Sequence, residues 1–308
     1  MKTLIVLVTY NGYAMTKDCL SVLSKLPPEH WRIAISDNAS SDGSPQKIAV
    51  DFPQAKVYAL SKNKGFGFAN NEALCRSLEK ENFDFVCFLN NDTIVTVESM
   101  EKLREDAEKD SGKTIFAPLV KNRDGSLQRT DYRFLSHAEF FLNAFRTVRG
   151  ADQRLHGELK AVAETHFLSN DWINAVCWMM PVQTFFDVGM FDEKIFMYYE
   201  DQDFAYRARK LGYRFLLNAE APIVHLGGGS AKNVLSRSLQ HDSSQLYFYR
   251  KHFGYGGAVL SRTFRFVRSL LRLGMLVPFA LFKKSARDNA RIHWKLLLFS
   301  LNGKGILK

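Results

Sequence analysis

Cysteine is scarce in this sequence and is not clustered. The chain has four cysteines among 308 residues, and no two of them form a Cys-x-x-Cys pair. This spacing argues against a zinc cluster and against a disulfide framework, and it favours a reducing compartment. The four are Cys19, Cys75, Cys87 and Cys177.

Long apolar runs are also missing. The first run, Leu4–Val8, is too short for the core of a signal peptide and no small-residue cleavage site follows it, so we interpret it as a β-strand. Near the C-terminus the longest uncharged apolar stretch, Leu273–Phe282, has ten residues. A membrane-spanning helix needs about twice that length. We therefore expect no transmembrane helix.

Net charge is absent from most of the chain. Residues 261–308 contain eleven Lys or Arg against the single acid Asp288, which accounts for the whole net charge of +10 and leaves residues 1–260 formally neutral. A neutral body with a basic, Leu- and Phe-rich end favours an anionic membrane surface over nucleic acid. We expect a cytoplasmic protein that is peripheral at the inner face of the cytoplasmic membrane.

The basic residues of this tail recur at helical spacings, which predicts amphipathic helices that lie in the membrane interface with their cations toward the lipid surface. A helical appendage that packs on the protein itself, or on a second subunit, is the alternative. The residues are Arg262, Arg265 and Arg268 in one set and Arg287, Arg291 and Lys295 in the other.

The first 115 residues read as strands that alternate with helices. Apolar strands are expected at 4–9, 31–36, 56–60 and 83–89, with helices at 17–26 and after the glycines at 65–67. This order predicts a mostly parallel α/β sheet with helices on both faces. Farther along, 171–181 contains a strand, and 198–211 contains a helix that ends at Gly212.

Polar residues follow each of these strands, at the edge of the sheet where α/β proteins bind ligands. TYN follows the first strand, DNASSDGS the second, NKGFGFAN the third and NNDT the fourth, and YYEDQDFAYRAR with HLGG comes later. In this order and spacing, over about residues 3–255, the motifs resemble family 2 inverting glycosyltransferases, most of all the rhamnosyltransferase-like branch.

The resemblance implies the glycosyltransferase A fold, which is Rossmann-like. Residues 1–260 would form the catalytic domain, with a nucleotide-binding half to about 115 and an acceptor-binding half from about 116, and residues 261–308 would form the basic helical tail. The implied reaction is inverting transfer of a sugar, rhamnose from dTDP-rhamnose or a sugar from another dTDP or UDP donor, to a hydroxyl of a lipid-linked or growing cell-surface glycan.

The resemblance also assigns the nucleotide-sugar site. Asp37 would accept the ring N–H of thymine or uracil, although an aspartate at a turn often only caps it. Gly65 would allow close approach to the nucleotide, or would only relieve a tight turn. The full set is Thr9, Tyr10, Asn11, Asp37, Asn38, Asn63, Gly65, Asn70, Asn90, Asn91 and Asp92.

A Mg²⁺ or Mn²⁺ ion is expected beside Asp92. The family's D-x-D motif reads here Asn90-Asn91-Asp92, so only one carboxylate remains. Hard cations accept amide and water oxygens, and the donor's phosphates supply negative charge. His225 is a candidate further ligand, which would favour Mn²⁺. A buried core histidine is the alternative.

Three acids, Glu200, Asp201 and Asp203, open the predicted catalytic helix, where the helix dipole tolerates carboxylates. By resemblance Asp201 is the base that deprotonates the acceptor. Asp203 lies about 200° around the helix and is expected to pair with Arg207.

The remaining expectations follow the family pattern. Trp172, Asn174 and Glu200 would line the acceptor side, with simple core packing of the tryptophan as the alternative. Ser230 and Lys232 would close over the diphosphate, or would belong to a plain surface loop.

Other functions fit less well. A processive synthase would be expected to carry Q-x-x-R-W and several membrane spans. A nucleotidyltransferase would need a Gly- and Arg-rich loop where this chain has TYNGYAM. The weakened D-x-D motif leaves an inactive glycan-binding or scaffold protein as a third alternative.

Overall fold

The computed structural model describes residues 1–110, 112–134, 167–168, 171–227 and 234–302. These form two compact units. The first contains the described residues up to 227, apart from 197–199. Those three residues belong with the helices from 234 onward in the second unit. The second unit thus begins before residue 260. That the catalytic domain ends at residue 260 stays a prediction.

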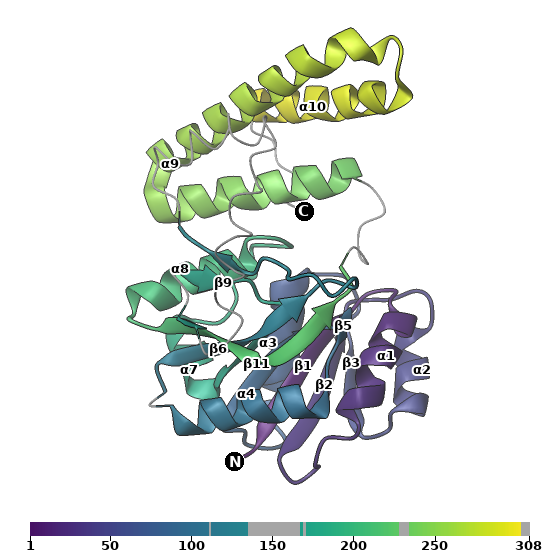
Figure 1. Cartoon of the computed structure of the whole chain (residues 1–308), viewed down its shortest axis with the longest axis vertical. Helices are drawn as coiled ribbons and strands as arrows, with labels where there is room; N and C mark the ends of the chain where they lie inside the picture. Colours follow the sequence, from purple (N-terminus) through teal and green to yellow (C-terminus); the bar gives the residue numbers. More distant parts are fainter. Residues whose placement is uncertain (111, 135–166, 169–170, 228–233, 303–308) are drawn as a thin grey trace. The chain divides into compact units, whose positions relative to one another are not determined.

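A nine-stranded sheet forms the centre of the first unit (Figure 1). Its order is β3-β2-β1-β4-β10-β6-β11-β5, and β8 pairs with β11. Strands β1 to β4 run parallel, β10 is antiparallel to β4 and β6, and β6 is parallel to β11. The strands are β1 (Thr3–Thr9), β2 (Trp31–Asp37), β3 (Ala55–Ala59), β4 (Phe85–Asn90), β5 (Thr93–Ile94), β6 (Thr114–Lys121), β8 (Phe167–Leu168), β10 (Cys177–Pro181) and β11 (Arg214–His225). A separate ribbon pairs β7 (Asp131–Tyr132) with β9 (Trp172–Ile173).

Helices cover both faces of the sheet, as predicted. In β1, Ile5 and Leu7 belong to the core under one set of helices, while Leu4 and Val6 belong to the core on the other face. Because both faces are buried, β1 is a continuous apolar run. The first face carries α1 (Tyr13–Leu23), α2 (Ser44–Asp51) and α4 (Val97–Lys109), and the second carries α3 (Phe66–Leu78), α7 (Val182–Val188) and α8 (Glu200–Lys210). The mostly parallel α/β sheet is confirmed.

Strand register aligns the ends of three strands at one edge. Thr9 of β1 lies opposite Asp37 of β2, and Val8 lies opposite Asn90 of β4. Because β10 is antiparallel to β4, it begins at this same edge. Residues after β1, β2 and β4 and residues before β10 therefore share one region.

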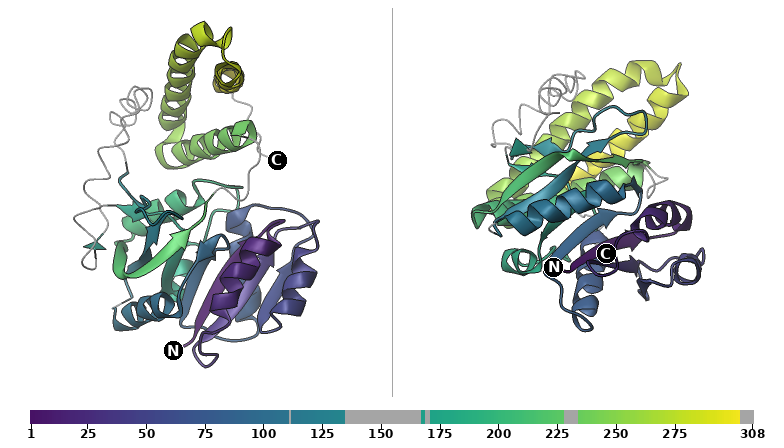
Figure 2. Two further views of the ribbon diagram at one scale, coloured as in Figure 1. Left: turned by 45° about the vertical axis from the view of Figure 1, so that its right-hand side comes forward. Right: turned by 60° about the horizontal axis from the view of Figure 1, so that its bottom comes forward.

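The second unit is helical and contains α9 (Val234–Ala280) and α10 (Lys284–Asn302), which pack against each other (Figure 2). Helix α9 bends at Gly254, whose φ of 67° and ψ of −155° are not helical. Within the described ranges, no helix combines the length and the apolar character that crossing a membrane requires.

The predicted surface position is wrong for Arg265, whereas Arg262 and Arg268 are partly buried and their contact with a lipid surface stays a prediction. Arg265 is fully buried, Arg262 donates from Nε to the carbonyl of Ser300 at 3.0 Å, and Arg268 lies 3.5 Å from a carboxylate oxygen of Asp242. Helical spacing shows that the three share a face, but not whether that face is turned to solvent. The second basic set, Arg287, Arg291 and Lys295, is exposed.

Candidate functional site

Asp37 ends β2 with a buried carboxylate, only 1% exposed. Its Oδ1 accepts the backbone N–H of Ser40 at 2.9 Å, which is the capping role of a turn aspartate. Its Oδ2 is buried and has no hydrogen-bond partner among the described residues. A buried acceptor left unpaired costs about 1–3 kcal/mol. Capping therefore explains one oxygen, and the other fits a donor on a ligand, such as a pyrimidine ring N–H.

The loops after β1 and β2 are tied to each other by Asn11. Its backbone is left-handed, with φ 49°. Its N–H donates to Oγ of Ser40 and its Oδ1 accepts the N–H of Ser41, both at 2.8 Å. The neighbouring Tyr10 is 47% exposed, so its ring is available to a ligand. Asn11 thus shapes the loops, while Tyr10 is the residue that a ligand can contact.

Gly65 is required by a close approach of protein backbone. Its φ is +96°, and an added Cβ would lie 2.1 Å from the carbonyl oxygen of Phe196. That oxygen also accepts the N–H of Phe66 at 2.9 Å. Asn38 holds the same loop by donating to the Gly65 carbonyl at 3.1 Å and accepting from the Lys64 N–H at 3.0 Å. The backbone that approaches Gly65 closely is therefore the protein's own.

Asn63 and Asn70 also serve the glycine loop. Asn63 accepts the Gly65 N–H at 3.0 Å, and Asn70 donates to the Phe66 carbonyl at 3.0 Å inside α3. The sequence predicts that these amides lie near the nucleotide, and the structure shows that they hold the glycine loop and the first turn of α3.

Asp92 and His225 lie side by side although 133 positions separate them. Strand β5 pairs with β11 so that His225 is opposite Thr93, and Nε2 of the imidazole lies 3.2 Å from Oδ1 of Asp92. On the other side of the ring, Nδ1 lies 3.0 Å from Oε1 of Gln128. In the tautomer whose Nδ1–H donates to Gln128, the Nε2 lone pair and the carboxylate oxygen face each other. Two acceptors at this distance fit a shared cation or proton.

The neighbouring amide of Asn91 is engaged by other side chains. The Asn91 amide donates to Oγ1 of Thr16 at 2.9 Å and lies 3.4 Å from Oγ1 of Thr9, which anchors it to α1. The backbone of Asn90 donates to the carbonyl of Val176 at 2.9 Å. Thr9, predicted to contact the nucleotide, is buried and accepts from Thr16 at 3.0 Å.

The protein therefore offers a small ligand set for a divalent cation. Within the described ranges, no three His, Cys, Asp or Glu residues cluster in a way that could hold a metal. A carboxylate and an imidazole, completed by phosphate and water oxygens, fit a cation that binds together with its substrate, as Mg²⁺ commonly does. Asp92 and His225 are the residues that would hold it.

Asp201 reaches the same edge of the sheet through β10. Its Oδ2 accepts the N–H of Ala175 at 3.3 Å and its Oδ1 accepts the N–H of Gln202 at 2.8 Å. The next residue after Ala175, Val176, accepts the N–H of Asn90. Two backbone contacts thus connect the Asp201 carboxylate to the end of β4. The predicted base therefore contacts the segment before β10, and the predicted metal ligand Asp92 follows the neighbouring strand β4.

The other two acids differ in their surroundings. Burial raises the pKa of Glu200 to about 8, and the adjacent Asp201 carboxylate adds to the shift. Glu200 Oε2 is buried without a hydrogen-bond partner among the described residues. Asp203 pairs with Arg207 at 2.9 Å, so its predicted ion pair is confirmed. Arg207 also donates to the Met190 carbonyl at 2.7 Å, which fixes α8 to the preceding loop.

Trp172 is largely packed. Its ring stacks on Tyr132, with centroids 5.0 Å apart, and on Phe134 at 6.1 Å. Its Nε1 and the Oδ1 of Asn174 are nevertheless buried without hydrogen-bond partners in the described part of the chain. Core packing explains the position of the ring. The two unpaired polar atoms could hydrogen-bond an acceptor, so the acceptor-side role of Trp172 and Asn174 stays a prediction. Ser230 and Lys232 lie outside the described residues.

Sequence reasoning missed two residues that hold the site together. Gln128 contacts His225 across 97 positions, and no local motif marks it. Asn71 donates to the Phe191 carbonyl at 2.9 Å and accepts the Phe191 N–H at 3.2 Å, joining α3 to the loop before α8. It directly follows Asn70, the last residue of the predicted motif, and so lies one position outside the motif.

Comparison with known proteins decides the family. The model of the family described as "Glycosyl transferase family 2" matches residues 4–165. The chain belongs to this family. The glycosyltransferase is 25% identical over 279 residues to an N-acetylglucosaminyl-diphospho-decaprenol L-rhamnosyltransferase of Mycobacterium tuberculosis, an alignment that covers 85% of this chain and 88% of the relative. It is 24% identical over 245 residues to the dTDP-rhamnosyl transferase RfbF of Shigella flexneri, with 80% and 76% covered.

Solved structures show the same fold. The mannosyltransferase PcManGT of Pyrobaculum calidifontis, in complex with GDP-Man and Mn²⁺, superposes with a TM-score of 0.58 at 12% identity, covering 98% of this chain and 88% of that one. GalNAc-T7 with UDP, GalNAc and Mn²⁺ gives 0.54 at 14% identity, covering 81% of this chain and half of the other. The predicted family and glycosyltransferase A fold are confirmed.

Proposed function

We propose that this glycosyltransferase transfers rhamnose from dTDP-rhamnose, with inversion at the anomeric carbon, to a hydroxyl of a lipid-linked glycan. The observation that carries the proposal is the shared sheet edge. Asp37 ends β2 there, and Asp92 follows β4 and pairs with His225. The Asp201 carboxylate contacts the segment that leads into β10 at the same edge. Rhamnosyl transfer by two relatives supports the choice of sugar.

The donor would lie along this edge. The thymine N–H donates to the unpaired Oδ2 of Asp37, and the Tyr10 ring contacts the nucleotide. The diphosphate lies toward Asp92 and His225, the residues that would hold Mg²⁺ or Mn²⁺. When bound, the cation supplies charge stabilisation to the departing diphosphate. Mn²⁺ in two solved structures of this fold supports a divalent ion of this kind.

Asp201 would take the proton of the acceptor hydroxyl. The oxygen then attacks the anomeric carbon on the face opposite the diphosphate, the bond from that carbon to the diphosphate oxygen breaks, and dTDP departs with the electron pair. One displacement inverts the configuration. Glu200, with its raised pKa, is mostly protonated near neutral pH, so it does not compete as the base and can hydrogen-bond an acceptor hydroxyl.

A panel of nucleotide sugars tests the donor. A ligand that binds only the folded state raises the melting temperature. We expect dTDP-rhamnose with Mn²⁺ to raise it more than UDP-glucose or GDP-mannose. A larger rise of the melting temperature with a UDP-sugar would assign a UDP-sugar as the donor and would leave the assignment of the site residues unchanged. No shift with any nucleotide sugar would favour the inactive glycan-binding alternative, which the single carboxylate in Asn90-Asn91-Asp92 suggests.

We also propose peripheral attachment to an anionic membrane through the turn between α9 and α10. Leu281 and Phe282 are 80% and 85% exposed, and Lys283 and Lys284 follow them directly. Exposed apolar side chains beside cations are typical of segments that enter the lipid interface. In Figure 1 this turn is the end of the helical pair where α9 leads into α10.

A further inference from the structure

Four consecutive polar residues near the start of α9 are buried. Asp242, Ser243, Ser244 and Gln245 are each at most 6% exposed. Successive residues of a helix point about 100° apart, so these four side chains do not share one core-facing stripe. Buried polar side chains are normally hydrogen-bonded. Ser244 and Gln245 find partners in residues 197–199, which belong to the same compact unit as α9.

Two consecutive tyrosines of this segment, Tyr198 and Tyr199, have left-handed backbones with φ of 64° and 70°. Bulky residues seldom adopt this conformation, and it persists only where surrounding contacts fix the backbone. Oγ of Ser244 donates to the carbonyl of Met197, the residue before the two tyrosines, at 2.7 Å. Nε2 of Gln245 donates to the Tyr199 hydroxyl at 2.6 Å. Two side chains of α9 therefore hold both ends of the strained segment.

A buried arginine orients Gln245. Arg265 is fully buried, and its Nε donates to Oε1 of Gln245 at 3.2 Å. Because a guanidinium has only donors, the amide oxygen faces Arg265 and the amide nitrogen is turned toward Tyr199. Oδ1 of Asp242 lies 3.8 Å from Arg265 and supplies the opposite charge. A buried ion pair adds little net stability, so the contacts fit a role in orienting the amide.

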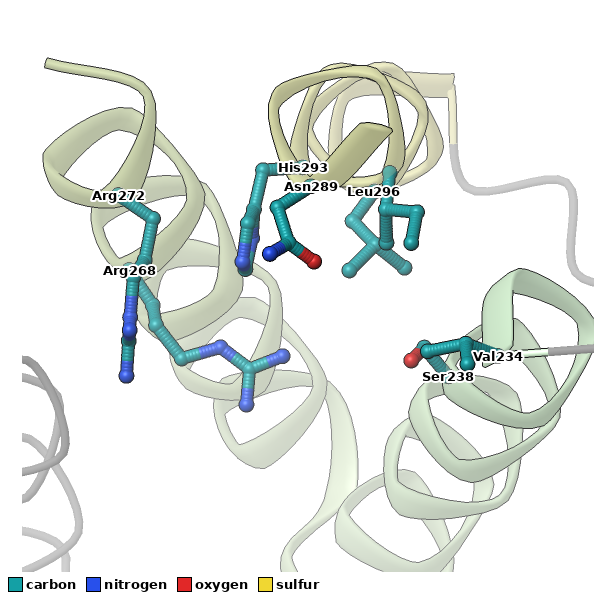
Figure 3. A pocket seen from close by; sticks show the side chains of 8 residues that line it. Val234, Ser238, Arg268, Arg272, Asn289, His293 and Leu296 are labelled. Atoms are coloured by element: carbon teal, nitrogen blue, oxygen red, sulfur yellow. The ribbon is translucent and has the colours of Figure 1, made fainter. Parts of the chain in front are cut away.

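Arg268 is the outer member of this network. It lies 3.5 Å from the same oxygen of Asp242, and it lines a pocket of about 320 Å³ between α9 and α10 (Figure 3). Water in this pocket can solvate Arg268. Arg265 does not line the pocket and is fully buried. The route through Arg265 to Gln245 is therefore shielded from solvent.

The strained segment leads directly into the catalytic helix. Tyr199 is bonded to Glu200, the first residue of α8, and Asp201 follows. The Asp201 carboxylate accepts the N–H of Ala175 at 3.3 Å. Because a single residue separates Tyr199 from Asp201, a rotation of the tyrosine backbone would displace this carboxylate.

We propose that Ser244 and Gln245 are positioning residues of the transfer reaction. By fixing the two left-handed tyrosines, they aim the Asp201 carboxylate at the acceptor hydroxyl. The inference rests on the proposed function, in which Asp201 is the base. It adds residues of α9, far along the chain from the strand-end motifs, to the requirements of the reaction.

Three single variants of the full-length protein test this role. Ser244→Ala and Tyr199→Phe each remove one hydrogen bond that holds the strained segment. We expect both to lower kcat by about 10- to 100-fold, because a small misplacement of a reacting group can cost this much. The affinity for dTDP-rhamnose, measured by calorimetry, should stay that of the wild type.

Ser243→Ala is the matched control. It removes the same hydroxyl from the neighbouring buried position, where Ser243 donates to the Leu239 carbonyl at 2.9 Å inside α9. This variant loses a comparable hydrogen bond but no contact with the strained segment, so its kcat should equal that of the wild type. An equal loss of kcat in Ser243→Ala and Ser244→Ala would reflect general destabilisation and would overturn the positioning role.

Hydrogen exchange of the Ala175 amide, followed by NMR, needs no turnover. If Asp201 is displaced, this amide loses its acceptor and should exchange about tenfold faster in Ser244→Ala and Tyr199→Phe, but not in Ser243→Ala. Faster exchange in a protein whose wild type makes no rhamnosyl product would reject the proposed function and support the positioning role. Exchange that matches the control in both variants would overturn the positioning role, whatever their turnover.

Discussion

Nε2 of His225 lies 3.2 Å from Oδ1 of Asp92, and Gln128 holds the opposite nitrogen of the same ring. The pairing of β5 with β11 creates this contact, because it sets His225 across from Thr93. A residue that fixes the tautomer of a metal-binding histidine tunes its affinity for the ion. We therefore predict different effects for variants of the Asp92–His225 pair and for variants of Gln128, which orients the imidazole.

Gln128→Ala should weaken Mn²⁺ binding in the presence of dTDP by about 10- to 100-fold, the usual effect of losing such a supporting residue. Calorimetry measures it directly. Gln128→Glu keeps an acceptor oxygen for Nδ1–H and should bind at least as well as the wild type. Gln183→Ala, at an exposed position of α7, is the matched control. An unchanged Mn²⁺ affinity in Gln128→Ala would remove the residue from the site.

Asp92→Ala should change metal-dependent donor binding, whereas Asn91→Ala should change the stability of the fold. Asp92→Ala removes the charged ligand, so Mn²⁺ should no longer strengthen dTDP-rhamnose binding. Asn91→Ala loses the hydrogen bond to Thr16, which should lower the free energy of unfolding by about 1 kcal/mol and leave the Mn²⁺ effect in place. Calorimetry and urea unfolding distinguish them. A full Mn²⁺ effect in Asp92→Ala would argue for metal-independent transfer.

Glu200→Gln should change how stability depends on pH. The folded pKa is raised from the ordinary 4.5 to about 8, so between these values the folded state binds more protons than the unfolded state. The free energy of unfolding of the wild type therefore falls as pH rises through this window. The glutamine variant lacks this term and should gain stability relative to the wild type on going from about pH 5 to about pH 9. Urea midpoints at both pH values decide it, and a constant difference would show that Glu200 does not titrate in this window.

Phe282→Asp should lower retention on anionic vesicles about tenfold or more, because it replaces an inserted aromatic side chain by a charge. Tyr255→Asp is the matched control, since Tyr255 is also 85% exposed and lies near the bend of α9 instead of in the turn between α9 and α10. Vesicle sedimentation at low salt compares them. Equal losses would show that the turn has no special part in attachment.

The sequence predicts the sheet well because β1, β2 and β4 are buried on both faces and stand out as apolar runs between polar turns. It does not predict α2 or α4. Proline in the first turn of α2, after the polar segment DNASSDGS, reads as a loop but is compatible with a helix start. Helix α4 is mostly polar, with a narrow buried stripe at Met100, Leu103 and Ala107.

The site was predictable where a motif carries the chemistry and not where it depends on long-range packing. Asp37, Asp92 and Asp201 follow strands or open a helix, so topology alone brings them to one edge. The supporting contact from Gln128 requires the path of the chain after β6, which no local pattern specifies. The arginines at 262, 265 and 268 show the same limit, because their buried partners lie on other turns of the helices.

The most direct test of the central claim is product formation from dTDP-rhamnose and a lipid-linked acceptor, followed by NMR of the new anomeric centre. We predict that the wild type forms a product of inverted configuration, and that Asp201→Asn binds the donor normally but turns over about 10²- to 10⁴-fold more slowly. Near-normal turnover in Asp201→Asn, or a product of retained configuration, would contradict the account.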